Sequence, residues 1–380
     1  MDYYHFFQSL LKNADIELDG NRAWDIKVND PKMFNRIVEQ GSLGLGESYI
    51  EKQWECDDLA EMISRLIQTD IESQVNLAAK IKMGASLGKQ KFKRLVNSQT
   101  IIRAKADVSA HYDLGNDLYE SMLDPRMTYT CGYWKQAQSL SEAQEHKLDL
   151  LCRKLGLSEG MRVLDIGCGW GSFMNFAAEK YGVICDGLTL SKEQATFGQN
   201  RADISGLPVN FILQDYREYR PNLKYDAVVS VGMIEHVGPR NYREYFDCVE
   251  RFMKDEAIFV LHGIGSSISM TECDPWINKY IFPNGVIPSL EQLSTAMEPK
   301  FNIEDVHNFG PDYDKTLSAW YGNFLSAWPG LQDKYGDKFF RIWRYYLLSC
   351  AGAFRARDLN LWQIAMTKVG RPLPNCVRES

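Results

Sequence analysis

Apolar segments of strand length alternate with segments of helical periodicity along most of the chain beyond residue 140. The apolar segments are rich in Val, Ile and Leu, as parallel strands buried on both faces are. Ser141, Ser191 and Ser289 each stand three residues before a Gln, a spacing that predicts capped helix starts between the strands. The candidate strands are residues 163–166, 183–188, 209–213, 225–231, 257–264 and, after helical patterns at 317–327 and 340–354, residues 361–369. This alternation predicts an α/β fold built on a doubly wound sheet.

The first part of the chain has a different pattern. Residues 59–71 have helical periodicity, and residues 41–46 are typical of a glycine-rich turn. Residues 80–105 then carry eight basic side chains and no acidic one, and such a shift in composition marks a boundary. We therefore expect a small, mainly helical N-terminal domain at 1–80, a basic linker at 81–105 and a larger domain at 106–380.

The composition is that of an ordinary globular protein, with 45% hydrophobic and 24% charged residues among 380. No apolar run approaches the roughly 18 to 20 residues that span a bilayer. The chain opens with no basic patch before an apolar stretch, so we expect no secretory signal and a cytoplasmic protein. Nine scattered cysteines without a C-x-x-C pair indicate reduced thiols rather than disulfides or a metal site. The net charge of −7 argues against general nucleic-acid binding.

Residues 163–172 form a strand that continues into a glycine loop and then a helix, an arrangement that binds ligands of nucleotide type. Gly167, Gly169 and Gly171 let the backbone pass close to such a ligand. A dinucleotide-binding loop has the spacing G-x-G-x-x-G and an acidic residue about 20 positions later. Here the third glycine comes one position early, which disfavours a nicotinamide dehydrogenase.

Four further segments accompany this loop in a fixed order: residues 111–116, 127–134, 231–238 and 252–264. In this set the chain resembles the bacterial cyclopropane fatty acid synthases, which are class I S-adenosylmethionine methyltransferases with a Rossmann-like, seven-stranded sheet. The mycolic acid cyclopropane synthases share much of it, and residues 41–49 and 350–358 favour the phospholipid enzymes. The resemblance implies transfer of a methylene group from S-adenosylmethionine to the cis double bond of unsaturated acyl chains in membrane phospholipids, which forms cyclopropane fatty acids.

The resemblance also implies an unusual base. In this family a bound bicarbonate accepts the proton that is lost on ring closure, and its ligands fall on Glu235, His262, Tyr313 and the backbone near Cys131 and Ile264. A carboxylate can only accept, so Glu235 should engage the hydroxyl of the anion while Tyr313 donates to it. A neighbouring carboxylate raises the proton affinity of the bound anion, which makes it a better base. We reject a nucleophilic role for the Cys131 thiol, because no base is assured beside it.

The same resemblance assigns the cofactor contacts. Asp165, at the end of the first strand, helps to orient the glycine loop and the methionine end of S-adenosylmethionine. The other contacts carried over are Tyr129, Thr130, Gly167, Gly169, Leu188, Thr189 and Gln194, with Tyr216 and Arg217 at the adenine end. Aromatic rings stabilise positive charge without offering a lone pair to alkylate, and the candidate walls are Tyr112, Tyr133 and Trp134. Asp186 interrupts an apolar strand, and the pattern gives it no role.

An enzyme that modifies the acyl chains of a bilayer has to reach them from the surface. The basic residues at 80–105 are interleaved with apolar ones and are suited to anionic lipid, where each contributes about 1 kcal/mol. A solvated linker is the alternative interpretation of this segment. The resemblance implies a homodimer attached peripherally to the inner face of the cell membrane, with the phospholipid surface as its partner and no nucleic-acid partner.

Other functions fit parts of the sequence. A fatty acid C-methyltransferase or a small-amine N-methyltransferase would share the cofactor loop, but simple N-methylation does not need the base set around Glu235. A lipid-binding protein without catalysis would bind lipid and form no product.

Overall fold

The computed structural model describes residues 3–71 and 115–376. The predicted linker at 81–105 and the predicted wall residue Tyr112 lie outside the described residues. The chain divides into two compact units, of residues 1–96, 273–283 and 317–359, and of residues 97–272, 284–316 and 360–380. Two segments of the predicted larger domain therefore group with N-terminal residues, while the boundary near residue 80 stays a prediction.

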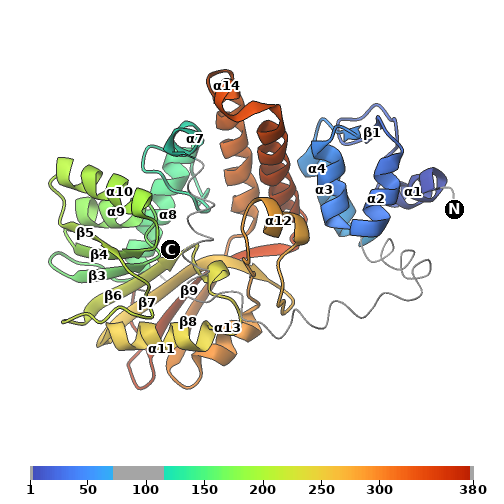
Figure 1. The fold of residues 1–380 in the computed structure, drawn as a ribbon. Coiled ribbons are helices and arrows are strands. Elements are labelled where there is room, and N and C mark those ends of the chain that lie inside the picture. The colour runs from blue at the N-terminus through green and yellow to red at the C-terminus, as the bar shows by residue number, and fades with distance from the viewer. Residues whose placement is uncertain (1–2, 72–114, 377–380) are drawn as a thin grey trace. The chain divides into compact units, whose positions relative to one another are not determined.

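The second unit is built around a seven-stranded sheet with the strand order β5-β4-β3-β6-β7-β9-β8 (Figure 1). Its strands are β3 Arg162–Ile166, β4 Ile184–Thr189, β5 Val209–Leu213, β6 Tyr225–Val231, β7 Met253–Ser266, β8 Phe301–Asn308 and β9 Leu359–Lys368. The pairs from β5 to β7 are parallel, and β8 pairs with β9 antiparallel. The strand order reverses between β3 and β6, and open α/β sheets bind ligands at the carboxyl ends of strands at such a point. The predicted doubly wound, seven-stranded α/β fold is confirmed.

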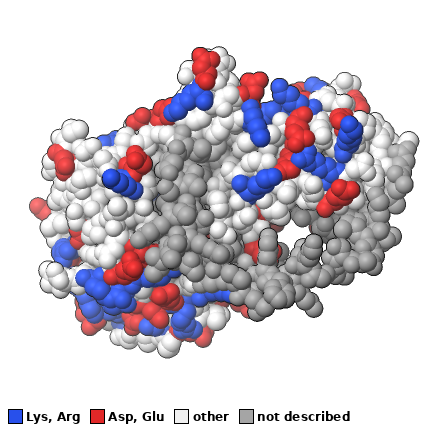
Figure 2. Space-filling model, in the orientation of Figure 1, with Lys and Arg blue, Asp and Glu red and all other residues white. Residues whose placement is uncertain are grey.

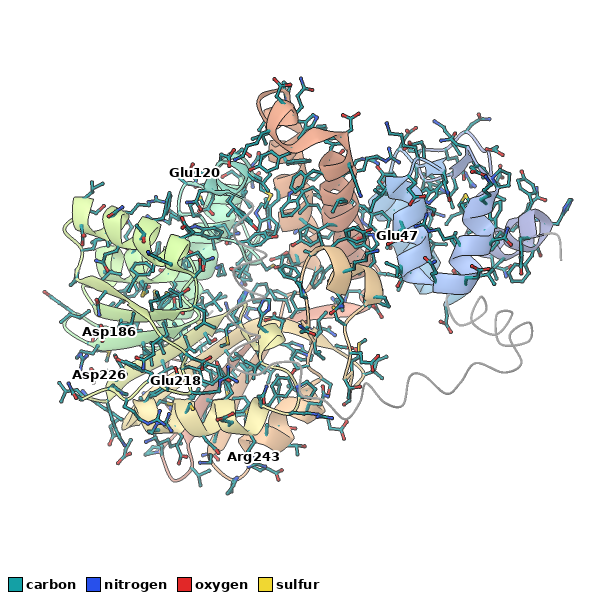
Figure 3. All side chains as sticks on the ribbon, viewed as in Figure 1. Glu47, Glu120, Asp186, Glu218, Asp226 and Arg243 are labelled. Carbon is teal, nitrogen blue, oxygen red and sulfur yellow. The ribbon has the colours of Figure 1, made fainter. Side chains whose placement is uncertain are left out.

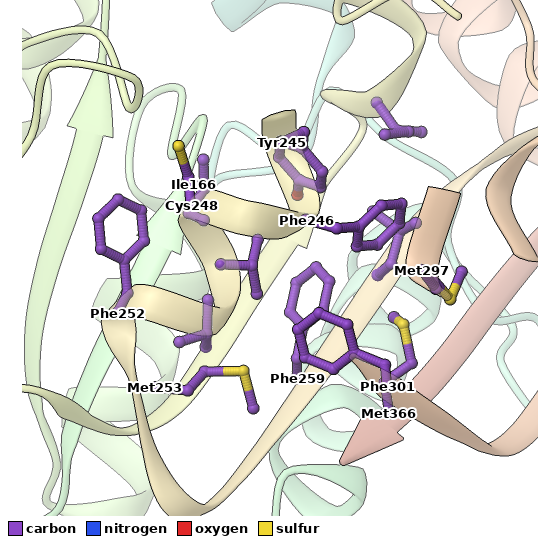
Figure 4. Close-up of a cluster of buried hydrophobic side chains, with 14 of the residues drawn as sticks. Ile166, Tyr245, Phe246, Cys248, Phe252, Met253, Phe259, Met297, Phe301 and Met366 are labelled. Carbon is purple, nitrogen blue, oxygen red and sulfur yellow. The ribbon is translucent and has the colours of Figure 1, made fainter. Parts of the chain in front are cut away.

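Alternate residues of the strands fill two cores, one on each face of the sheet. Phe259 packs in one core with Phe246 and Met297 (Figure 4), whereas its neighbour Ile258 packs in the other core with Leu151. The helices of this unit are α7 Asn116–Met122, α8 Leu140–Lys154, α9 Ser172–Tyr181, α10 Lys192–Ile204, the short 3₁₀ helix η2 Ile234–His236, α11 Tyr242–Phe252 and α13 Leu290–Met297. Because both faces are buried, the central strands are rich in apolar residues.

The hydrophobic pattern located the strands better than it located the helix starts. β5 and β6 have the predicted bounds, but β8 was not predicted because its sequence FNIEDVHN is largely polar. The predicted helix start at Ser141 is wrong, since Ser139 caps α8 by accepting a hydrogen bond from the Glu142 N–H group. Ser139 and Glu142 have the S-x-x-E spacing of a capping box, which competes with the spacing that begins at Ser141. The two helical patterns after residue 311 belong to α14 Pro311–Arg355, which is kinked at Gly336 with φ of 74°.

The first unit is mainly helical in its described N-terminal part, with a two-stranded sheet. Its described elements are α1 Tyr3–Lys12, β1 Lys27–Val28, α2 Lys32–Gln40, α3 Ser42–Ile50, β2 Trp54–Glu55, α4 Leu59–Gln68, α12 Pro275–Tyr280 and the part of α14 from Leu317 onward. The glycine-rich turn predicted at 41–46 is wrong, because residues 42–50 form α3. A Cβ atom on Gly44 would overlap the backbone of Arg36 in α2, and one on Gly46 would overlap the indole of Trp276 in α12. These glycines therefore allow close helix packing rather than a turn.

Polar side chains join α3 to α2 and α12 within this unit. Glu47 of α3 is 8% exposed, and its carboxylate accepts hydrogen bonds from Arg36, Lys279 and Tyr280 (Figure 3). Burial alone would raise the pKa of Glu47, but these donors outweigh burial and lower the pKa to about 2.

Arginines of α14 bind the end of the same helix. Arg341 Nε donates to the Tyr49 carbonyl at 2.9 Å, and Arg344 donates to the Tyr49 hydroxyl. The C-terminal half of α3 is thus held by residues far along the chain.

None of the helices in the described ranges is long and apolar enough to cross a membrane. All nine cysteines are free thiols in the structure. On the face that Figure 2 shows, Lys and Arg side chains are interspersed with Asp and Glu over the described residues.

Candidate active site

The glycine loop follows β3 at the carboxyl ends of the strands, next to the point where the strand order reverses between β3 and β6. Gly167, Gly169 and Gly171 have φ angles of 84°, 55° and 80°, in the left-handed region that glycine adopts without strain. A Cβ atom on Gly167 would lie 2.6 Å from Cγ of Met233, so a side chain has no room there. α9 begins at Ser172, which places the positive end of its dipole beside the loop. The structure thus contains the predicted strand, loop and helix.

The end of β4 lies against this loop. The Leu188 carbonyl accepts hydrogen bonds from the N–H groups of Gly167 at 2.9 Å and Cys168 at 3.0 Å. The Thr189 hydroxyl donates to Oε1 of the buried Gln194 at 3.3 Å. Four predicted cofactor residues therefore meet at the carboxyl edge of β3 and β4.

Asp165 is buried at the end of β3, with 2% of its surface exposed. Its Oδ1 atom has no hydrogen-bond partner in the described structure. Burial raises the pKa of Asp165 to about 7, and the nearby Lys147 ammonium acts in the opposite direction. This carboxyl group is thus held in an environment that favours a positively charged neighbour.

The two residues predicted at the adenine end are already engaged within the protein. The Tyr216 ring is buried and packs edge-to-face on Tyr245, with the ring centroids 5.4 Å apart. Arg217 forms an ion pair with Asp215 at 2.7 Å. Their role as adenine contacts stays a prediction.

Glu235 lies in η2, directly after β6. Its Oε1 atom accepts a hydrogen bond from the Ile264 N–H group at 2.6 Å, and its Oε2 atom is buried without a partner in the described structure. Burial raises the pKa of Glu235 to about 7, and the Ile264 N–H group opposes this shift. The structure therefore brings two predicted base-site residues together and leaves one carboxyl oxygen available.

His262 is buried in β7, two residues before Ile264. Burial lowers the pKa of His262 well below its usual value, so the ring is neutral at physiological pH. Its Nδ1 atom lies 3.4 Å from Nε2 of Gln363, and its Nε2 atom has no partner in the described structure. The backbone carbonyl of His262 accepts from the Gly232 N–H group at 2.8 Å, which ties β7 to the loop that leads to Glu235.

Cys131 lies in a segment that contacts the first turn of α14. The Thr316 hydroxyl accepts hydrogen bonds from the Gly132 N–H group at 3.1 Å and from the Trp134 indole N–H at 2.9 Å. Asp312 accepts from the Trp134 backbone N–H at 2.8 Å. Burial raises the pKa of the Cys131 thiol well above its usual value, which supports the rejection of a nucleophilic role.

Tyr313 belongs to that same first turn of α14 and is 9% exposed. Aromatic contacts connect this region to the base residues. The Phe309 ring lies 5.9 Å from the His262 ring and 5.2 Å, edge-to-face, from the Tyr133 ring. Segments separated by more than 100 residues thus meet at one site.

Tyr129 is linked to the glycine loop through aromatic contacts. Its ring lies 5.2 Å from that of Tyr119 in α7, which in turn lies 4.9 Å from Trp170 in the loop. The predicted roles of Tyr129, Tyr133 and Trp134 as walls and cofactor contacts stay predictions.

The sequence analysis missed Lys147 and Thr316. Lys147 is 1% exposed, and its ammonium donates to the Thr130 hydroxyl at 2.9 Å. It stands four residues after Ala143 and four before Leu151, both buried on the apolar side of α8. A charged residue on an apolar helical stripe was the signal that could have identified it. Thr316 carried no comparable signal, because its contacts depend on the docking of distant segments.

The arrangement suits a nucleotide-type cofactor that carries positive charge. The backbone of the glycine loop and of the end of β4 can lie close to such a cofactor. Asp165 provides a buried hydrogen-bond acceptor. The unpartnered Oε2 of Glu235 suits a donor such as a hydroxyl, and the neutral His262 lies on the adjacent strand.

Comparisons with known proteins agree with this geometry. The sequence profile of the mycolic acid cyclopropane synthetase family matches residues 99–364. The chain is 48% identical to the cyclopropane-fatty-acyl-phospholipid synthase of Escherichia coli, over 97% of this chain and 94% of that protein.

Two solved structures are also similar. The cyclopropane synthase MmaA2 from Mycobacterium tuberculosis is 29% identical with a TM-score of 0.65, over 69% of this chain and 97% of that chain. The mycolic acid cyclopropane synthase CmaA1, solved with SAH and CTAB, is 31% identical with a TM-score of 0.64 and the same coverage. The chain therefore belongs to the cyclopropane synthase family of S-adenosylmethionine-dependent methyltransferases.

Proposed function

We propose that this enzyme, which as a cyclopropane synthase transfers a methylene group from S-adenosylmethionine, acts on unsaturated acyl chains of membrane phospholipids with bicarbonate as its base. The name of the Escherichia coli relative, which matches nearly the whole chain, supports the substrate class. The complex of CmaA1 with SAH supports the cofactor.

The cofactor supplies a sulfonium methyl group, and bicarbonate supplies a base for the proton lost on ring closure. Gly167, Gly169, Leu188, Thr189 and Gln194 would hold the cofactor. An alkene is a poor nucleophile, so a fixed cofactor orientation contributes much of the rate.

The observation that carries the base proposal is the buried, unpartnered Oε2 of Glu235. A carboxylate in this position accepts the hydroxyl of an anion and increases the basicity of that anion. The Ile264 N–H group holds the other oxygen and so fixes the orientation of the carboxyl group. The neutral His262 adds no positive charge that would lower the basicity.

Burial of the site protects the reaction from water. Cys131, His262 and Tyr313 are at most 9% exposed, and Phe309 packs between the rings of His262 and Tyr133. A carbocation formed in such a site loses its proton before water captures it.

We further propose that the enzyme works as a homodimer at the inner face of the cell membrane. The basic side chains at 80–105 support this, because they suit an anionic lipid surface. Neutralising Lys89, Lys91, Lys93 and Arg94 together should weaken sedimentation with anionic vesicles and spare cofactor binding. Unchanged sedimentation would contradict the membrane role, and a monomer in analytical ultracentrifugation would contradict the dimer.

Mass spectrometry with a deuterated methyl donor tests the reaction. The purified chain is incubated with unsaturated phospholipid vesicles and S-adenosylmethionine that carries three deuteriums on its methyl group. We expect a product that has gained one methylene with two deuteriums and has lost its double bond. A methyl branch that keeps all three deuteriums would identify a fatty acid C-methyltransferase, and the absence of any lipid product would contradict the proposed substrate.

The same assay tests the base. Removal of dissolved carbon dioxide should lower turnover, and added bicarbonate should restore it. Turnover that does not respond to bicarbonate would contradict the proposed base.

A further inference from the structure

Lys147 of α8 is a buried cation that has no ion-pair partner among the described residues. Its ammonium donates to the neutral hydroxyl of Thr130 at 2.9 Å, and within the described residues no carboxylate oxygen lies within 4.0 Å of it. Burial lowers the pKa of Lys147 to about 8. A buried charge without a paired counter-charge costs several kcal/mol, so the residue reduces stability where an apolar side chain would add to it.

Two side chains from the same face of α8 bind one threonine. Gln144, one turn before Lys147, donates to the Thr130 carbonyl at 2.8 Å, while Lys147 donates to the Thr130 hydroxyl. On its other side Thr130 lies against the loop after β6, since a Cβ atom on Gly232 would lie 2.6 Å from Cγ2 of Thr130. Thr130 is therefore fixed between α8 and the carboxyl end of β6.

Thr130 connects two parts of the candidate site. The next residue along the chain is Cys131, and Gly232 begins the loop that leads to Glu235. Lys147 also lies close enough to Asp165 to affect the pKa of that carboxyl group. A displacement of Thr130 would move the backbone of Cys131 relative to Glu235.

We propose that Lys147 is a positioning residue for methylene transfer. Its ammonium holds the hydroxyl of Thr130 and thereby fixes the position of the backbone of residues 129–132 relative to the loop that carries Glu235. The inference rests on the proposed function of this site. The proposed effect of Lys147 is exerted through the Thr130 hydroxyl, to which its ammonium donates. Its effect should appear in turnover more than in cofactor affinity, because misplacement of about 1 Å costs up to about 100-fold in rate.

The test is a double-mutant cycle in the full-length chain, with turnover from the deuterium assay and cofactor affinity from calorimetry. We expect Lys147→Met to lower kcat by about 10-fold or more and to change the Kd of S-adenosylmethionine by less than about threefold. Thr130→Val, which removes the hydroxyl and keeps the shape, should lower kcat similarly. The double variant should be no slower than the slower single variant, because both changes remove one interaction.

Two further variants separate positioning from stability. Lys154→Met is the matched control, since Lys154 is also buried on α8 but contacts Asp305 and His307 instead, and its kcat should stay within about threefold of wild type. Thr130→Ser keeps the hydroxyl and should retain most of the turnover that Thr130→Val loses. This serine–valine pair still tests whether the Thr130 hydroxyl is needed if Lys147→Met fails to fold.

The outcomes are distinguishable. Additive effects in the cycle, equal turnover of Thr130→Ser and Thr130→Val, or wild-type turnover of Lys147→Met would overturn the inference while wild-type product formation supports the proposed function. A wild-type chain that forms no cyclopropane product would instead overturn the proposed function.

Discussion

Glu47 and Glu235 are both carboxyl groups withdrawn from water, and their pKa values move in opposite directions. Glu47 of the first unit has three side-chain donors, two of them cationic, and its pKa falls to about 2. Among the described residues, the carboxyl group of Glu235 in the second unit accepts a hydrogen bond from one other residue, through the Ile264 N–H group, and its pKa rises to about 7. Burial raises the pKa in both cases, so the number and charge of the donors decide the result.

The difference separates a group that holds helices together from a group available for chemistry. The hydrogen bonds that the Glu47 carboxylate accepts in the described structure come from side chains of α2 and α12. Glu235 keeps a buried oxygen that has no partner among the described residues, which is costly unless a ligand uses it. Perturbed carboxyl groups of the second kind are the ones that mark functional sites.

The largest effect is expected from Glu235→Gln. This change keeps the shape of the side chain and removes its ability to act as a carboxylate, so kcat should fall about 10²- to 10⁴-fold, the usual contribution of acid–base catalysis. The Kd of S-adenosylmethionine should change by less than about twofold, because the proposed partner of Glu235 is the anion. Wild-type turnover of the variant in bicarbonate buffer would contradict the assignment.

Glu47→Gln should act on stability instead. The change leaves Arg36 and Lys279 without their shared carboxylate, and because both cations are partly exposed we expect a loss of about 2 kcal/mol. Urea unfolding of the full chain measures it. Glu51→Gln is the matched control, since Glu51 pairs with the same Arg36 but is exposed, and it should cost less than about 1 kcal/mol. Equal costs for the two variants would show that burial of Glu47 is unimportant.

The pH dependence of stability should have opposite signs for the two residues. The stabilising contribution of Glu47 is present above the unfolded pKa of about 4.5 and is lost as the pH falls toward 2. The contribution of Glu235 is present below about 4.5 and is lost as the pH rises toward 7. Relative to wild type, Glu235→Gln should therefore gain stability between pH 4.5 and 7, while Glu47→Gln should become less destabilising below pH 4.5. Unfolding midpoints measured across pH test both, and parallel curves for the two variants would contradict the comparison.

The smallest effect is expected from Asp186→Asn. Asp186 of β4 accepts hydrogen bonds from Arg162 at 3.0 Å, Tyr225 at 2.8 Å and Asn210 at 3.1 Å, so it resembles Glu47 in its partners (Figure 3). We expect a loss of about 1 kcal/mol in stability and no change in cofactor affinity. Reduced cofactor affinity at unchanged stability would contradict this structural role for Asp186.

The parts of the fold that the sequence predicted are those in which local pattern and burial agree. The strand β3, the loop with Gly167 and the helix α9 follow from apolar residues, glycines and a helix start in direct succession. Ile258 and Phe259 show the same agreement, since residues 257–261 of this strand are buried on both faces and are apolar at successive positions.

The parts that could not be predicted depend on contacts between distant segments. The glycines around positions 44 and 46 predicted a turn. Nothing nearby in the sequence indicates that Gly44 packs against the Arg36 backbone and Gly46 against the Trp276 ring. Asp186 had no predicted role because its partners lie on other strands, Arg162 on the adjacent β3 and Tyr225 on β6. Lys147 was overlooked for a different reason, because its unfavourable position on an apolar stripe is explained only by its contact with Thr130.

The first unit consists of three separate segments of the chain, and this affects the order in which the ribosome synthesises its parts. The partner of Glu47 at Lys279 lies 232 residues further along the chain, and that of Tyr49 at Arg344 lies 295 residues further. At about 5 to 20 residues per second, a ribosome needs on the order of 10 to 60 s to make these partners after α3 has emerged. During that interval the nascent helices expose surfaces that α12 and α14 later cover, and chaperones can bind them. The helices that precede α12 and α14 in the chain are therefore translated before those partners and are completed only after them.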